Sequence, residues 1–138
     1  MLKTILVAYD GSEPAERAFR FALELARAFQ ATIHVVAVAS PPEPPTALEM
    51  AGLLESATEH FKHAFAGLRH EAQAAGVPMS TRIVAGHAAA EIVREATEQK
   101  ADLVVMGRRG GSRIERWLLG SVSKRVLSYA PCSVTVVQ

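Results

Sequence analysis

Short apolar runs alternate along the chain with longer segments that are apolar on one side only. The runs are aliphatic and rich in β-branched residues, which is typical of strands buried within a sheet. They occupy residues 2–9, 32–39, 80–85, 101–106 and 133–137. The pattern therefore predicts five strands, each separated from the next by a segment that contains a helix.

The first two of these helices carry clear start signals. Ser12 precedes Glu13 and Pro14, a favourable first turn for a helix, and Ser12 is expected to cap it. Thr46 followed three residues later by Glu49 has the form of a capping box, and it predicts a long helix up to about residue 75. The apolar face of the first helix is predicted to consist of Ala18, Phe19, Ala22, Leu23, Ala26 and Phe29.

Two further helices are predicted in the second half of the chain. The one after Gly86 is expected to turn its apolar positions toward a core, namely Ile92, Val93 and Ala96. The last begins near Ser121, a candidate N-cap, and its expected apolar side comprises Val122, Val126 and Leu127.

Strands that alternate with helices indicate an α/β fold with an open parallel sheet and helices on both faces. In such sheets a ligand lies beyond the carboxyl ends of the strands, where the strand order reverses. The chain has 138 residues, which predicts one domain.

Charge and composition narrow the classes of function. The net charge is only +1, yet residues 107–125 hold six Arg and Lys residues and the single acid Glu115. Trp117 is the one aromatic residue in this segment, which does not make the interleaved pattern of single-strand binding, so nucleic-acid binding is not expected. The lone Cys132 excludes an internal disulfide, and the N-terminal apolar run is too short to cross a membrane. We expect a cytoplasmic protein without a membrane segment.

The most informative stretch follows the fourth strand. Gly107, Gly110, Gly120 and Ser121 lie between that strand and the last helix. A glycine-rich connection from a strand to a helix brings backbone N–H groups close to an anion, and the helix N-terminus adds partial positive charge. The alternative is that these glycines only form a turn and cap the helix.

This spacing, G-x2-G-x9-G-[ST], resembles that of the universal stress protein family, in its ATP-binding subgroup. The similarity extends from the residues around Asp10 to the closing strand. It implies a Rossmann-like sheet, similar to the adenine nucleotide alpha hydrolases, with strand order 3-2-1-4-5. It also implies one nucleotide-binding domain over residues 1–138, ATP with Mg2+ as ligands, a homodimer paired near the C-terminal strand, and a regulatory role under stress.

The resemblance and the residue chemistry together give the expected nucleotide site. Asp10 is expected to bind ribose hydroxyls or a metal on the phosphates, and its alternative role is to cap the first helix or to tighten the turn before it. Arg108 and Arg109 either neutralise phosphate charge or lie exposed. The predicted site comprises Ala8, Asp10, Val38, Met106, Gly107, Arg108, Arg109, Gly110, Gly120, Ser121, Val122 and Ser123.

Catalysis has little support in the sequence. No serine–histidine–acid set is evident and no metal-ligand set emerges from the spacing. His60, His63 and His70 are expected on a solvated helix face. His34 is expected to be hydrogen bonded to a partner or to lie at a sheet edge, and His87 is expected to lie near the ligand crevice at most. One rival function is slow ATP hydrolysis or autophosphorylation at Ser121 or Ser123. Another is the binding of other proteins without a nucleotide, and a third is signalling through a cyclic or adenylate nucleotide.

Overall fold

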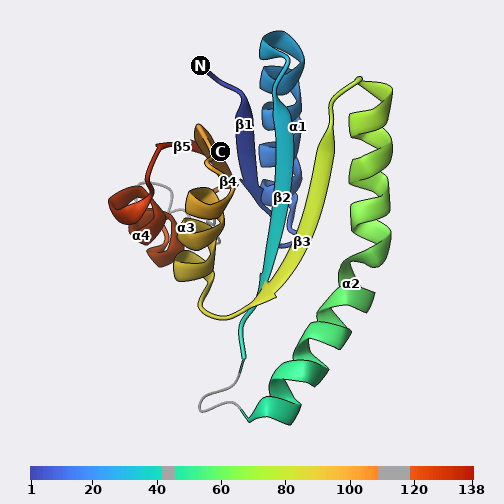
Figure 1. Ribbon diagram of the computed structural model, residues 1–138, viewed down its shortest axis with the longest axis vertical. Coiled ribbons are helices and arrows are strands. Elements are labelled where there is room, and N and C mark those ends of the chain that lie inside the picture. The colour runs from blue at the N-terminus through green and yellow to red at the C-terminus, as the bar shows by residue number, and fades with distance from the viewer. Residues whose placement is uncertain (42–45, 109–118) are drawn as a thin grey trace.

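The computed structural model describes residues 1–41, 46–108 and 119–138. These residues form one five-stranded parallel sheet in the order β3-β2-β1-β4-β5, as the sequence predicts (Figure 1). The strands are β1 (Thr4–Ala8), β2 (Thr32–Ala39), β3 (Met79–Ala85), β4 (Leu103–Gly107) and β5 (Ser133–Val137). The helices are α1 (Glu13–Phe29), α2 (Ala47–Ala74), α3 (Ala88–Glu98) and α4 (Ser121–Tyr129).

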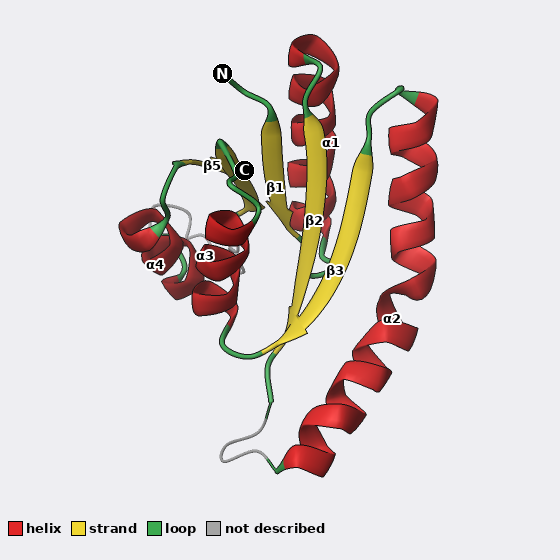
Figure 2. Ribbon diagram, viewed as in Figure 1, coloured by secondary structure: helices red, strands yellow, loops and turns green. Residues whose placement is uncertain are grey.

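The sheet lies between two pairs of helices (Figure 2). On β1, Ile5 and Val7 point into a core shared with α1 and α2, whereas Leu6 points into a core shared with α3 and α4. All three side chains are fully buried because successive residues of a strand point to opposite faces. This double burial explains why the central strands are continuous apolar runs rather than alternating ones.

The order of the strands reverses between β1 and β4. From β1 the chain proceeds to β2 and β3 on one side, then returns to place β4 against the other side of β1. Ala8 lies opposite Met106 in this pairing, so both strands end at the same level. The expected meeting of the segments that follow β1 and β4 is therefore confirmed.

Local capping fixes where the first two helices begin. Ser12 is the N-cap of α1, and its hydroxyl accepts a hydrogen bond from the Ala15 amide at 3.3 Å. Thr46 caps α2, and its hydroxyl accepts from the Glu49 amide at 3.1 Å. Both starts follow the sequence prediction. None of the described helices is long and apolar enough to cross a membrane.

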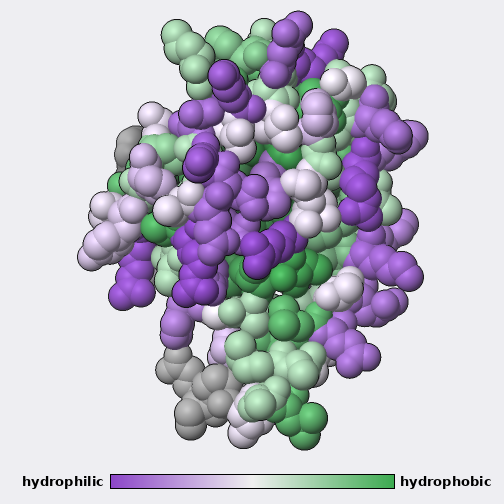
Figure 3. Space-filling model, viewed as in Figure 1, coloured by the Kyte–Doolittle hydropathy of each residue, from purple (hydrophilic) through white to green (hydrophobic). Residues whose placement is uncertain are grey.

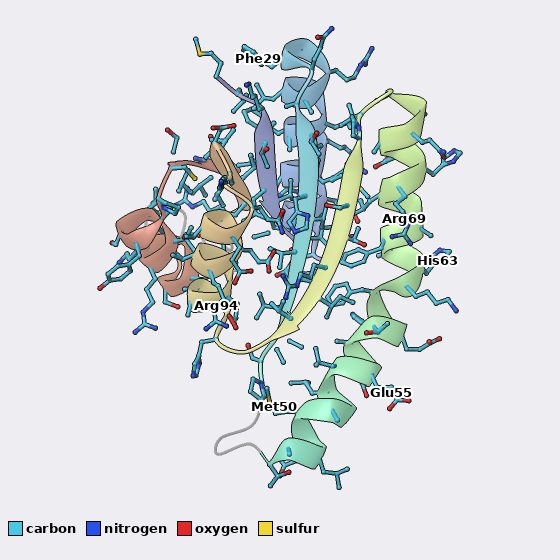
Figure 4. The ribbon with its side chains drawn as sticks, in the orientation of Figure 1. Phe29, Met50, Glu55, His63, Arg69 and Arg94 are labelled. Carbon is cyan, nitrogen blue, oxygen red and sulfur yellow. The ribbon has the colours of Figure 1, made fainter. Side chains whose placement is uncertain are left out.

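The apolar faces end earlier than the periodicity predicts. Phe29, at the end of α1, is 57% exposed (Figure 4), and Leu127 of α4 is 43% exposed, so both expectations of core burial are wrong. Phe29 lies in the last turn, beyond the sheet that covers the rest of that face. Strand ends also shift: residues 4–8 replace 2–9, and residues 103–107 replace 101–106.

Candidate functional site

A cavity of about 570 Å³ opens at the carboxyl ends of β1, β2 and β4, where the strand order reverses. This is the place where open parallel sheets hold their ligands. Its size is within the range of small-molecule sites. The lining residues are Ala8, Tyr9, Asp10, Ser12, Pro14, Ala15, Val36, Val38, Ser40, Ala88, Ile92, Met106, Gly107, Leu119, Gly120, Ser121, Val122 and Ser123.

The structure brings most of the predicted site residues together around this cavity. Nine of them line it: Ala8, Asp10, Val38, Met106, Gly107, Gly120, Ser121, Val122 and Ser123. Arg108 is not among the lining residues, and its backbone N–H donates to the Val137 carbonyl at 2.8 Å. Arg109 and Gly110 lie outside the described residues, as does Trp117.

Asp10 lies on the rim of the cavity directly after β1. Its Oδ1 accepts hydrogen bonds from the backbone N–H of Ser12, at 3.0 Å, and from the Ser12 hydroxyl. Gly11 between them has φ +82°, which glycine adopts without strain. Asp10 therefore tightens this turn, and the same turn holds its carboxylate at the cavity.

Packing against α1 requires a glycine at residue 107. A Cβ atom at Gly107 would lie 2.4 Å from the carbonyl oxygen of Pro14, in the first turn of α1. The end of β4 thus comes closer to α1 than any other residue type allows. Because both residues line the cavity, this close approach defines one of its walls.

The start of α4 also lines the cavity. Gly120 is its N-cap and Ser121 its first residue, so the expectation that Ser121 caps the helix is wrong. The first turn carries no acidic residue, and the Lys124 amide is the first to bond back, to the Gly120 carbonyl at 3.0 Å. The amides before it have no partner within the helix, which makes this terminus attractive to an anion.

Sequence reasoning missed several lining residues, of which Tyr9 is the most distinctive. Its hydroxyl donates to the Glu16 carboxylate, and its ring packs against Phe61 and Phe65 of α2, with centroids 6.2 and 6.0 Å away. Burial, reinforced by the adjacent Glu16, raises the pKa of the Tyr9 phenol well above its usual range. The only signal was its place beside Asp10 at the end of a strand.

The other missed residues share two locations. They lie in or just after the second half of β2, or at and just before the opening turns of helices, and they comprise Ser12, Pro14, Ala15, Val36, Ser40, Ala88, Ile92 and Leu119. Since α1, α3 and α4 all begin at this edge, three helix N-termini meet at one cavity. Such termini are recognisable in sequence, but their convergence depends on the order of the strands.

The remaining candidates lie elsewhere. His60, His63 and His70 are exposed on α2, as expected; His63 points away from the sheet (Figure 4). His87 is the N-cap residue of α3 and is not among the lining residues. Within the described residues, no group of three or more His, Cys, Asp and Glu residues is placed to hold a metal ion. Cys132 is a half-buried free thiol whose pKa is raised by burial.

Together, the parallel sheet in the order β3-β2-β1-β4-β5 and the cavity at its switch point define an α/β protein of the Rossmann-like class. The chain belongs to the universal stress protein family, whose model matches residues 1–138.

Individual relatives agree with this assignment. A universal stress protein of Thermus aquaticus is 39% identical over 140 residues, which cover 100% of each chain. A universal stress protein solved in complex with cAMP is 32% identical, with a TM-score of 0.75, and the match covers 99% of this chain and 97% of that one. A third, from Archaeoglobus fulgidus in complex with dAMP, is 25% identical with a TM-score of 0.70 over 100% of both chains.

Proposed function

We propose that this protein binds an adenine nucleotide, ATP with Mg2+, in the cavity at the ends of β1, β2 and β4, and that it acts as a regulatory stress-response protein. The observation that carries the proposal is the convergence of three helix N-termini with Asp10 on one cavity of about 570 Å³. This arrangement combines a place for an anion with a place for hydroxyl groups.

The lining is divided in a way that suits a nucleotide. Val36, Val38 and Ile92 supply an apolar surface for a base. Asp10 supplies a carboxylate that accepts hydrogen bonds from ribose hydroxyls. The first turn of α4 supplies backbone N–H groups and the Ser121 hydroxyl for phosphate oxygens.

Mg2+ fits the same donor set. This ion is usually held by one or two carboxylates together with substrate phosphates and water, rather than by a cage of protein ligands. Asp10 and the hydroxyls of Ser12 and Ser121 are among the hard oxygen donors that line the cavity. When bound, Mg2+ would neutralise phosphate charge beside the α4 terminus.

The relatives support the adenine part of the proposal. Two similar structures contain cAMP and dAMP. The preference for ATP rests on the sequence pattern formed by Gly107, Gly110, Gly120 and Ser121, with room for phosphates along α4.

Three further attributes belong to the same proposal. Residues 1–138 act as one nucleotide-binding domain, and the protein is a cytoplasmic homodimer. The dimer is supported by β5, which is an edge strand of the sheet and has no described strand paired with its outer side. The cytoplasmic location is supported by the single cysteine, Cys132, which leaves no internal disulfide.

The test measures both resident and added nucleotide. Freshly purified protein is denatured, and any released nucleotide is identified by chromatography and mass. Calorimetry then compares ATP, ADP, AMP and cAMP with and without Mg2+. Release of ATP, or tightest binding of ATP with Mg2+, supports the proposal. An empty protein that binds none of the four nucleotides would overturn it and would favour a module that binds other proteins.

Matched variants locate the site. Ala88→Phe places a ring at a lining position of α3, whereas Ala90→Phe places the same ring at an exposed position outside the lining. Asp10→Asn removes a charge at the cavity, and Glu13→Gln removes one from an exposed residue outside the lining. We expect Ala88→Phe and Asp10→Asn to weaken binding at least about tenfold, with little effect of the two controls. Phosphoserine at Ser121 or Ser123 would instead indicate autophosphorylation.

A further inference from the structure

A cluster of hydrogen-bonded polar side chains lies away from the cavity described above, where α3 packs on the sheet. Glu95 of α3 and His34 of β2 are 2% and 7% exposed. Ser80 of β3 is exposed beside them. None of the three lines the cavity described above. Hydrophilic side chains gather on the face that α3 and the middle of the sheet present in Figure 3.

Hydrogen bonds join the three residues in a row. Glu95 Oε2 lies 3.0 Å from His34 Nε2, and His34 Nδ1 is hydrogen bonded to the Ser80 hydroxyl. The other carboxylate oxygen, Glu95 Oε1, lies 2.8 Å from the guanidinium of Arg82. Arg82 thereby fixes the carboxylate from the neighbouring strand.

These contacts determine which histidine nitrogen accepts a proton. An ionised carboxylate can only accept, so Nε2 of His34 carries the hydrogen that faces Glu95. In the neutral ring, Nδ1 is then an acceptor, and the Ser80 hydroxyl donates to it. A nucleophile bonded to a base, which is in turn oriented by an acid, is the arrangement that activates serine in acyl transfer.

The Ser80 side chain can be reached from solvent, because Ser80 is exposed on the sheet edge. β3 is the edge strand of the sheet, and no described helix passes in front of it in Figure 1. The Ile33 amide donates to the Pro78 carbonyl at 2.9 Å, and amides alternate in direction along a parallel strand. The Ser80 amide therefore faces β2, while that of Thr81 points out of the sheet edge, next to the nucleophile.

We propose that Ser80 is a base-activated nucleophile that accepts acyl groups from activated esters, with His34 as its general base and Glu95 as a positioning residue. Ser80 Oγ forms a bond to the acyl carbon while His34 Nδ1 takes the hydroxyl proton. The bond from the acyl carbon to the leaving oxygen breaks, and that oxygen takes the proton from His34. The outward amide of Thr81 is the donor available to the developing oxyanion.

An internal control is available in the same chain. Ser128 of α4 is also exposed, but its hydroxyl donates to the Lys124 carbonyl at 2.9 Å, which cannot act as a base. The two serines therefore differ in their hydrogen-bond acceptor, an imidazole for Ser80 and a backbone carbonyl for Ser128. The proposal predicts that they differ in reactivity.

The experiment exposes the purified protein to p-nitrophenyl acetate and maps acetylation by peptide mass spectrometry over time. We expect acetyl-Ser80 to form at least about tenfold faster than acetyl-Ser128, because a positioned base contributes factors of that order or more. Ser80→Ala should abolish the fast phase of nitrophenolate release, and Ser128→Ala should leave it unchanged. Equal acetylation of the two serines in the unaltered protein would overturn the proposal.

The role of His34 is tested separately. His34→Gln keeps a polar side chain beside Glu95 and should slow acetylation of Ser80 to the rate of Ser128, as long as thermal unfolding shows a folded protein. An unchanged Ser80 rate in the folded variant would refute the general-base assignment. If His34→Gln does not fold, the comparison of Ser80 with Ser128 in the unaltered protein still decides the question.

Discussion

The close approach of β4 to α1 predicts that replacing Gly107 by alanine destabilises the protein. This is unusual, because glycine within a strand is generally less favourable than alanine. Gly107→Ala adds one methyl group, which would lie 2.4 Å from the Pro14 carbonyl oxygen and 2.5 Å from its carbon. Ordinary contacts with a Cβ atom begin at about 3.4 Å. The obstacle is backbone in the first turn of α1, so it cannot be relieved by rotating a side chain. The end of β4 or the start of α1 must shift.

The expected loss in the free energy of unfolding follows from measurements on proteins with overpacked cores. Forcing an extra methyl group into a packed site costs about 1–3 kcal/mol. For a chain of 138 residues the entropy of unfolding is roughly 290 cal/mol/K, at about 2.1 cal/mol/K per residue. A loss of about 2 kcal/mol then lowers Tm by about 7 °C.

Gly67→Ala is the matched control. Gly67 lies within α2, and a Cβ there would meet nothing within 4 Å. Alanine is favoured over glycine in a helix by about 0.8–1.0 kcal/mol, so this variant should raise Tm by about 3 °C. Thermal unfolding followed by circular dichroism, with urea titration for the free energy, measures both variants. If Gly107→Ala unfolds within about 1 °C of the unaltered protein, the packing argument fails.

Three other predictions concern pH and assembly. Because the pKa of the Tyr9 phenol is raised in the folded protein, the unfolded chain loses the phenol proton at a lower pH than the folded one. The free energy of unfolding should therefore fall as pH rises above about 10, and Tyr9→Phe should flatten that decline in urea titrations. Backbone hydrogen bonds from Lys3 and Thr4 lower the pKa of Asp102, so its contribution should be present above about pH 4 and lost as pH falls. Asp102→Ala should accordingly destabilise at pH 7 more than at pH 3, and an equal effect at both pH values would contradict this. Val136→Pro on the edge strand β5 should convert the proposed dimer to monomer in light scattering, whereas an unchanged mass would place the interface elsewhere.

Much of the fold could be predicted because its signals are local. Apolar runs of β-branched residues identified five strands, and Ser12 and Thr46 identified two helix starts. The errors lie at element ends, as with Phe29 and Leu127, where the sheet no longer covers a face that still reads as apolar. Periodicity records which side of a helix is apolar, but not how far the opposing layer extends.

Most of the candidate site could also be predicted, again because its signals are local. Glycines and Asp10 at strand ends mark positions where backbone meets ligand, and nine predicted residues line the cavity. Tyr9 and Ala88 were missed because nothing in their own segments distinguishes them. They reach the cavity only because β1 and α3 end and begin at the same edge of the sheet.

The sequence by itself determined the family, the alternation of strands and helices, and the glycine pattern that follows β4, since each of these resides in contiguous residues. Tertiary structure alone decided which distant side chains meet. His34 contacts Ser80 and Glu95, which are 46 and 61 residues away, because the register of β2 with β3 places His34 opposite Ser80 and α3 crosses the same face. Such contacts depend on strand order, register and helix placement together, and no single segment encodes all three.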